Sequence, residues 1–468
     1  MITLKQMLKL SLFFYLIANL LNCTKSSDLN VKAQGTQEGY FTQRLNWQDF
    51  SDNRTLQNRY LVNSDYASGP NAPVIYVPGG ESALNRTNFE NGYIGFVVKA
   101  MHAHYVSLEH RFYGKSQPFD KLTGENLKFL NLQSTLSDLA AFQKYWQGSQ
   151  NLTGKWFVWG GSYSGGLAAF YRLRYPDLAA GAISSSGTVH FSLIDQNGDK
   201  FAATAAGGEC VRNFRNKILS PIENSLNKPD AFQAIKQEFG AVQLKNDMEF
   251  LSLLGPVADF LLQTEGPLVL CSTVDVNHTT PTEARSEFIK LMNTTFARYS
   301  LNFLSLSSDG FKSEKASDYS KGTGFRQWTY HQCAELGGWD TSGPDADHAF
   351  GSFLPNYVQL QSEICKLSFG LTEPPNVDKT NSEYYQRLLD PNLASKILFV
   401  NGSADPVSIL SISKSNGNAV NPKFLYADID GGTHCQDLRP PNEHDSQSLR
   451  DVRDLELKTL IGWVNDDP

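Results

Sequence analysis

This chain has no surplus of basic residues: 41 lysines and arginines stand against 48 aspartates and glutamates, for a formal net charge of −7 at pH 7. Proteins that bind nucleic acid usually carry a basic surface, so we expect no nucleic-acid partner. The chain also has only six cysteines, and no two of them have the C-x-x-C spacing of a zinc site. We therefore expect neither a metal nor another cofactor.

Long apolar runs are equally scarce. After the first 25 residues no segment approaches the length of a membrane span, so we expect no stable association with a membrane. The N-terminus has Lys5 and Lys9 beside a short apolar stretch, LSLFFYLIANLL, at residues 10–21. This stretch is too short for a membrane span and suits a signal peptide, which we assign to residues 1–25. The chain should then enter the secretory pathway.

Two further features agree with secretion. Sequons in polar, loop-like segments predict N-glycosylation at Asn53, Asn85, Asn151, Asn277 and Asn293. Five cysteines follow the predicted signal peptide, which itself contains Cys23. An odd number of cysteines in an oxidising compartment implies two disulfides and one free thiol.

Segments typical of strands and helices alternate between residues 72 and 187, which predicts a mostly parallel sheet with helices on both faces. From about residue 190 to 385 the pattern is helical, and the alternation returns at 396–402 and 423–432. No internal repeat or low-complexity segment is present. We therefore predict an α/β core formed by residues 45–188 and 386–468, and a helical cap insertion at residues 189–385.

The segment WFVWGGSYSGGLAAFYRLRYP, residues 156–176, joins an apolar strand to a helix through a turn of glycine and serine. This is the context of the nucleophile elbow, G-x-S-x-G, of the α/β-hydrolase fold, where small neighbours avoid clashes around a strained serine. Ser162 has Gly160 and Ser164 as these neighbours, whereas Ser164 itself would lie in the first helical turn. We predict that Ser162 is the nucleophile. The alternative is a glycine-rich turn that packs closely or binds a phosphate.

A serine nucleophile needs a base and an acid, which in this fold follow it in the order Ser, Asp or Glu, His. Both returning strands end with a suitable residue: KILFVNGSADP supplies Asp405, and LYADIDGGTHC supplies His434. His110 also follows a strand but precedes the nucleophile, which is the wrong order. Asp428 and Asp430 lie within or just after the strand that carries His434. The predicted triad is Ser162, Asp405 and His434.

An oxyanion hole needs two backbone amides beside the nucleophile. Tyr163 follows Ser162 and would supply one of them. The glycines of VPGGE, residues 77–81, end an earlier strand and allow the backbone to approach closely, so Gly79 or Gly80 should supply the other. The alternative is that Pro-Gly-Gly forms a simple turn.

Six segments together are similar to one peptidase family: YVPGGES, LEHRFYGKSQPF, GGSYSGGLAAFYRLRYPDLAAGAISSSG, RQWTYHQCAE, NGSADP and GGTHCQDLRP. They resemble the family of lysosomal Pro-X carboxypeptidase and dipeptidyl peptidase II, most of all its thymus-specific serine protease branch, from about residue 45 onward. The resemblance implies an α/β-hydrolase core with an inserted helical cap, and a serine exopeptidase that cleaves beside proline. The family's nucleophile, acid and base fall on Ser162, Asp405 and His434. The chain departs from the family where Val407 replaces a common tryptophan and Ser164 replaces glycine or alanine.

The resemblance also implies a cap disulfide between Cys333 and Cys365. This leaves Cys210 and Cys271 as the second pair in the insertion, and Cys435 as the free thiol. The helical insertion must fold over the edge of the sheet where the catalytic loops lie, so it should narrow the entrance and admit short peptides as substrates. The resemblance further implies a lysosomal, vacuolar or extracellular location, and it leaves a homodimer open.

An exopeptidase needs a charged partner for one substrate terminus and, here, an aromatic surface for proline. The substrate-binding candidates are Glu81, Arg326, Trp328, Tyr330 and Glu335. Each of them could equally be an ordinary structural residue. Two other functions stay open: a carboxylesterase or lipase with the same triad, and a non-catalytic binding protein built on this fold. The first is disfavoured because the chain lacks an HGGG motif, and the second because the triad is intact.

Overall fold

The structure, a computed structural model, describes residues 35–275, 280–344 and 350–466. The predicted signal peptide and the sequon at Asn277 lie outside these residues. Residues Thr36–Pro468 form one compact unit, so the division into a core and a separate cap domain stays a prediction. Within the described residues no helix is both long and apolar enough to cross a bilayer.

Within the described residues, eight strands form one sheet in the order β1-β2-β4-β3-β5-β6-β9-β10. They are β1 Gln37–Arg44, β2 Thr55–Asn63, β3 Val74–Pro78, β4 His104–Leu108, β5 Trp156–Gly161, β6 Gly181–Ser185, β9 Ile397–Gly402 and β10 Leu425–Ile429. Strand β2 is antiparallel to both of its neighbours, and the other neighbouring pairs are parallel. The mostly parallel sheet is thus confirmed. Strands β1 and β2 are additions to the predicted set, and the sheet begins before residue 45.

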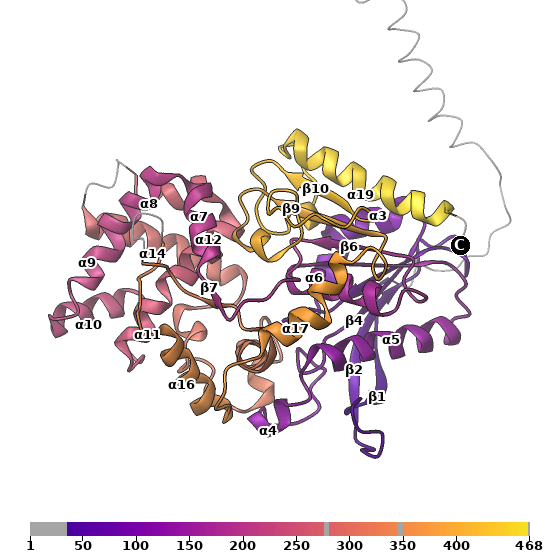
Figure 1. Cartoon of the computed structure of the whole chain (residues 1–468), viewed down its shortest axis with the longest axis horizontal. Coiled ribbons are helices and arrows are strands. Elements are labelled where there is room, and N and C mark those ends of the chain that lie inside the picture. The colour runs from indigo at the N-terminus through magenta and orange to yellow at the C-terminus, as the bar shows by residue number, and fades with distance from the viewer. Residues whose placement is uncertain (1–34, 276–279, 345–349, 467–468) are drawn as a thin grey trace, which may run out of the picture. The chain divides into compact units, whose positions relative to one another are not determined.

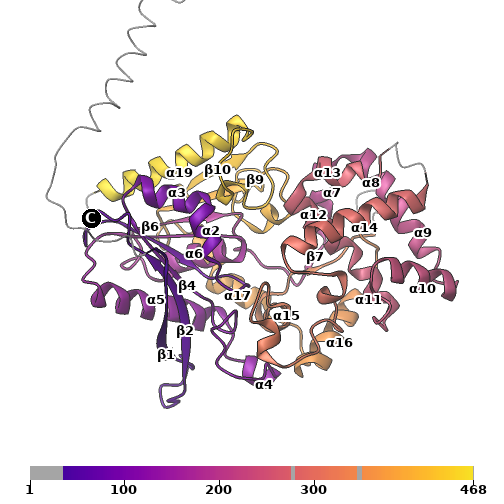
Figure 2. The ribbon, with the colours of Figure 1, turned by 180° about the vertical axis from the view of Figure 1, so that it is seen from behind.

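Alternate residues of the central strands face two separate apolar cores. The covering helices are α3 Tyr93–Ala100, α5 Leu132–Ser149, α6 Ser162–Arg174 and α19 Gln447–Asn465. Val74 and Tyr76 of β3 pack in the core that contains α5 and α6, whereas Ile75 packs with α3 and α19. Figures 1 and 2 show α5 on one side of the sheet and α3 with α19 on the other. Coverage of both faces explains the unbroken apolar runs in these strands, and it confirms the predicted α/β-hydrolase core.

Between β6 and β9 the chain is mostly helical, as predicted. The helices are α7 Asn197–Ala206, α8 Gly208–Phe214, α9 Ser220–Glu223, α10 Pro229–Glu238, α11 Asp247–Ser252, α12 Leu254–Glu265, α13 Pro267–Ser272, α14 Pro281–Arg298, α15 Phe325–His331, α16 Tyr357–Phe369, α17 Val377–Glu383 and α18 Tyr385–Leu389. A short parallel pair joins β7 Ile194–Asp195 to β8 Trp339–Asp340. The apolar core of this segment includes Phe112, Leu122 and Leu127, so the insertion packs continuously against the chain that follows β4.

The described sequons lie on the surface. Asn53, Asn85, Asn151 and Asn293 are all exposed, although Asn293 lies on helix α14 rather than in a loop. Glycosylation at these positions stays a prediction.

Two disulfides join helical segments of the insertion. They link Cys210 to Cys271 and Cys333 to Cys365, while Cys435 is free, as the resemblance and the remaining cysteines suggest. Replacing both Cys210 and Cys271 with alanine is expected to lower the free energy of unfolding by about 2–4 kcal/mol, because the bridge closes a long loop of the unfolded chain. Chemical denaturation without reductant measures this loss. An unchanged midpoint would contradict it.

Candidate active site

Ser162 occupies a strained turn at the carboxyl end of a central strand. Strand β5 ends at Gly161, helix α6 begins at Ser162, and Ser162 has a φ of +56°, in the left-handed region. Such a conformation costs a non-glycine residue about 1–3 kcal/mol and persists only where the surroundings impose it. It is the backbone geometry expected of a nucleophile elbow, and it places the Ser162 side chain where the strand gives way to the helix.

The small neighbours of Ser162 are required by close packing. A Cβ atom on Gly160 would lie 2.3 Å from the Ser164 carbonyl oxygen, and one on Gly161 would lie 2.9 Å from Cys435 Sγ. Ser164 is itself buried, and its hydroxyl donates to the Pro78 carbonyl over 2.6 Å. Because the Ser164 hydroxyl is already engaged in holding β3 to α6, this geometry favours Ser162 over Ser164.

Asp405 and His434 meet beside this turn. Asp405 follows β9, is fully buried, and accepts a hydrogen bond from the Val407 amide. His434 follows β10, and its Nδ1 lies 2.8 Å from Asp405 Oδ2. Burial alone would lower the pKa of His434, but the Asp405 charge and the neighbouring Cys435 outweigh it and raise that pKa well above its usual range. The pair therefore has the contact that orients a histidine base and stabilises its protonated form.

The loop that carries His434 is held from several sides. The His434 amide donates to the Gln263 carbonyl at the end of α12 over 3.2 Å, and Arg439 donates to the carbonyl oxygens of both residues. The Cys435 amide donates to Ser186 Oγ over 3.0 Å. Within the described residues no hydrogen bond joins Ser162 Oγ to His434, although free hydrolases often close that contact only with substrate. Sequence reasoning missed Gln263, because nothing local marks a residue that reaches the site from a distant helix.

Fewer backbone amides are available for an oxyanion hole than the sequence predicted. Tyr163 lies in the first turn of α6, where amides have no partner within the helix. The Gly79 amide is already used, because it donates to the Leu108 carbonyl over 2.8 Å. Gly80 lies against the elbow, since a Cβ atom added to it would be 3.6 Å from Ser164 Cβ. The structure thus argues against Gly79 and leaves Tyr163 and Gly80 as the proposed donors.

Two predicted substrate-binding residues, Arg326 and Tyr330, are engaged inside the protein instead, while Glu335 is half-buried. Arg326 is buried, and its guanidinium donates to the carbonyl oxygens of Leu122, Phe311 and Ser368. Tyr330 is buried with its ring 5.4 Å from that of Phe369. Glu335 accepts from the Leu132 amide and lies 3.0 Å from His331 Nε2. The contacts of Arg326 and Tyr330 hold helices α15 and α16 together, so we no longer assign these two residues to substrate. The role of Glu335 in substrate binding stays a prediction.

Glu81 and Trp328 remain beside the site. Burial raises the pKa of Glu81, while its hydrogen bond to a backbone amide and the charge of His434 act in the opposite direction. The Glu81 carbonyl accepts from Gly324, just before α15. Trp328 on α15 is half-buried, and its ring centre lies 5.3 Å from that of Tyr163. The insertion thus brings an aromatic surface to the residue that follows the nucleophile.

Replacing Asp405 with asparagine is expected to lower kcat by on the order of 10⁴-fold, because the histidine loses the carboxylate that fixes its tautomer and stabilises its charge. The acid limb of kcat/KM should also move to lower pH, since Asp405 raises the pKa of His434. Steady-state rates from pH 5 to 9 measure both effects. Unchanged kcat in a folded variant would show that Asp405 does not orient the base.

Comparisons with known proteins agree with this geometry. The model of the family described as serine carboxypeptidase S28 matches residues 43–456. The chain is 31% identical to "Probable serine protease EDA2" of Arabidopsis thaliana, over 86% of this chain and 81% of that protein. It is 30% identical to the thymus-specific serine protease of Mus musculus, over 92% of this chain and 88% of that protein, and 24% identical to the lysosomal Pro-X carboxypeptidase of Bos taurus, over 91% and 88%. The chain therefore belongs to the serine carboxypeptidase S28 family and is a serine-type peptidase.

Proposed function

We propose that this protein is a secreted or lysosomal serine exopeptidase that hydrolyses short proline-containing peptides through Ser162, Asp405 and His434. The observation that carries the proposal is the strained Ser162, with the His434–Asp405 pair on the adjoining loops. The resemblance to the lysosomal Pro-X carboxypeptidase of Bos taurus supports the proline preference and the location.

The proposed reaction forms and then hydrolyses an acyl-enzyme. Ser162 Oγ attacks the carbonyl carbon of the scissile bond while His434 accepts the hydroxyl proton, and the amides of Tyr163 and Gly80 donate to the resulting oxyanion. The C–N bond then breaks as the imidazolium returns that proton to the leaving amine. A water molecule attacks the acyl-enzyme with His434 as base, which releases the acid and restores Ser162.

Two contacts of the insertion support short substrates. On the base side, the end of α12 holds the His434 amide, and on the oxyanion side Gly324 donates to the Glu81 carbonyl. Because the insertion reaches the site at both places, it should narrow the approach to Ser162 and exclude folded proteins. Trp328 offers a flat surface on which a proline ring could pack.

The direction of cleavage is tested with one peptide that has proline both at position two and at the penultimate position. Mass spectrometry of the products separates release of an amino-terminal dipeptide from release of a single carboxy-terminal residue. We test amino-terminal release first, because Glu81 is an acidic candidate on which the charge of His434 acts, and a carboxylate suits a free amine. The control peptide has alanine in place of both prolines. Efficient internal cleavage of casein, without a preference for proline, would contradict the proposal.

The esterase alternative is tested in parallel. A carboxylesterase should prefer a p-nitrophenyl ester to an X-Pro amide, whereas a peptidase should turn over the amide. A binding protein without catalysis should hydrolyse neither substrate.

A further inference from the structure

Two carboxyl groups that the proposed mechanism does not use lie at the base of the His434 loop. Asp437 is three residues after His434, and its side chain accepts from Ser185 Oγ at the end of β6 over 2.6 Å. Glu456 lies on α19. Asp437 is 1% exposed and Glu456 is 0% exposed, and each acts on the pKa of the other, so the two carboxyl groups lie close together.

Their contact depends on a proton. An ionised carboxylate only accepts hydrogen bonds, so two of them cannot bond to each other. Among the described residues, neither Asp437 Oδ2 nor either Glu456 oxygen has a hydrogen-bond partner when both groups only accept. The pKa of Glu456 is raised well above its usual range, mainly by burial and next by the charge of Asp437. With a proton on Glu456, its hydroxyl could donate to Asp437 and satisfy both groups.

The groups around the pair supply little compensating charge. Arg453 on α19 is the one cation of the described residues whose charge acts on both carboxyl groups. Its guanidinium donors, however, go to the carbonyl oxygens of Gln436, Asp437 and Arg439 and to the Asp445 carboxylate. From α3, Tyr93 donates to the Arg453 carbonyl, and its own pKa is raised by burial and by Glu456. Strand β6 contributes the neutral hydroxyl of Ser185.

We propose that Asp437 and Glu456 share one proton and act as positioning residues, holding the His434 loop on α19 in the geometry that the proposed triad requires. The inference deepens the proposed function and rests on it. Loss of the proton would leave two buried carboxylates in contact, and their repulsion would push residues 436–438 away from α19. Since a Cβ atom on Gly161 would lie 2.6 Å from Leu438 Cδ1, this movement is transmitted to the turn that carries Ser162.

The direction of the pH effect follows from the raised pKa of Glu456. The shared proton is present below that pKa and is lost as the pH rises through it, so the loop is held below the raised pKa and released above it. Activity should therefore fall as the pH rises through the pKa of Glu456, and this fall is the alkaline limb that the variants test.

Replacing Glu456 with glutamine tests this. The amide can donate to Asp437 but cannot ionise, so kcat at the wild-type optimum should stay within about threefold, and the alkaline limb should move up by at least one pH unit. Glu456→Ala leaves Asp437 without a donor and should lower kcat about tenfold with little change in KM. Asp428→Asn, at a half-buried acid on β10 whose pKa is also raised, is the matched control and should leave the limb unchanged.

Two measurements on the full chain distinguish failure of the proposed function from failure of the shared-proton proposal. They are the rate of Ser162 labelling by a fluorophosphonate and the rate of hydrolysis of an X-Pro p-nitroanilide, both from pH 5 to 10. If the wild type shows neither reaction, the proposed function fails. If the wild type reacts but Glu456→Gln keeps the wild-type alkaline limb, or Glu456→Ala has wild-type kcat, the shared-proton proposal is overturned. If Glu456→Gln does not fold, Asp437→Asn replaces it, because the asparagine amide can donate to Glu456. This variant must move the alkaline limb up by the same amount.

Discussion

Replacing Ser162 with alanine is expected to abolish turnover, with a fall in kcat on the order of 10⁶-fold. Without the nucleophile no acyl-enzyme forms, and only the weak catalysis supplied by substrate binding and the oxyanion hole remains. The folded state should tolerate the change, because no described hydrogen bond of the protein uses the Ser162 hydroxyl and alanine keeps the Cβ atom. The measurement is kcat/KM on an X-Pro p-nitroanilide, together with mass spectrometry of the fluorophosphonate adduct.

Ser164→Ala is the matched control, two residues away on the same turn. Its hydroxyl donates to the Pro78 carbonyl, so its loss should lower the free energy of unfolding by about 1 kcal/mol and leave most activity intact. The fluorophosphonate should label the peptide at Ser162 in both the wild type and this variant. A dead Ser164→Ala enzyme beside an active Ser162→Ala enzyme would reverse the assignment.

The strand ends that carry the proposed triad could be predicted from sequence, because each signal is local. The run WFVW followed by glycine and serine marks the end of β5, and the runs that end near Asp405 and His434 mark β9 and β10. In a parallel sheet the carboxyl ends of strands share one edge, so residues far apart in sequence could be brought together by topology alone. The positive φ of Ser162 agrees with the strained turn that this argument requires.

The predictions that the structure corrects concern tertiary contacts, which no local sequence pattern reveals. Gly79 could not be separated from Gly80, because the bond from the Gly79 amide to Leu108 depends on the register of β3 and β4. Arg326 has the chemistry of a carboxylate ligand, yet three carbonyl oxygens from distant segments surround it. The pair of Asp437 and Glu456 arises because α19 folds back on the His434 loop, and neither residue stands out in its own segment. Tertiary packing, rather than residue type, decides the role of each of these side chains.

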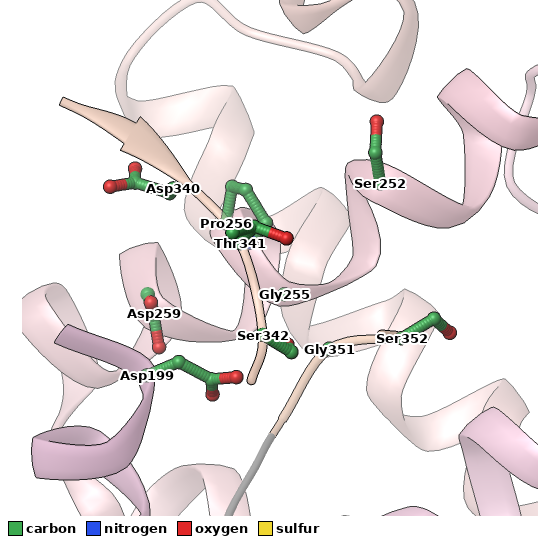
Figure 3. A pocket seen from close by; sticks show the side chains of 10 residues that line it. All are labelled: Asp199, Ser252, Gly255, Pro256, Asp259, Asp340, Thr341, Ser342, Gly351 and Ser352. Carbon is green, nitrogen blue, oxygen red and sulfur yellow. The ribbon is translucent and has the colours of Figure 1, made fainter. Parts of the chain in front are cut away.

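A second group of acids lies in the insertion, and two of its three members, Asp199 and Asp259, are buried while Asp340 is exposed. Asp199 on α7, Asp259 on α12 and Asp340 on β8 line a cavity whose other lining groups are mostly hydroxyls and glycines (Figure 3). Asp199 is 4% exposed and Asp259 is 8% exposed, and each has one carboxylate oxygen without a partner among the described residues. Burial, followed by the charges of Asp199, Asp340 and Asp195, raises the pKa of Asp259 well above its usual value.

This cluster should make the folded protein most stable at acidic pH. In the unfolded chain an aspartate loses its proton near pH 4, whereas folded Asp259 keeps its proton to higher pH. The folded state then binds more protons than the unfolded state, so the free energy of unfolding falls as the pH rises from about 4 to the raised pKa, by about 1.4 kcal/mol per pH unit for one retained proton. The same direction holds for Asp199, whose pKa is also raised by burial.

Replacing Asp259 with asparagine is therefore expected to stabilise the protein at neutral pH, by on the order of 2 kcal/mol, and to change its stability little near pH 4. Asparagine has nearly the same shape but cannot ionise, so the buried charge that develops with rising pH is removed. Thermal unfolding midpoints from pH 4.5 to 8 measure the effect: the wild-type midpoint should fall across this range, and the Asp259→Asn midpoint should fall less. Asp451→Asn, at an exposed position on α19, should follow the wild-type curve. A wild-type midpoint that rises from pH 5 to 8 would contradict the predicted acid stability. Parallel curves for wild type and Asp259→Asn would show that Asp259 does not retain a proton in the folded protein at these pH values.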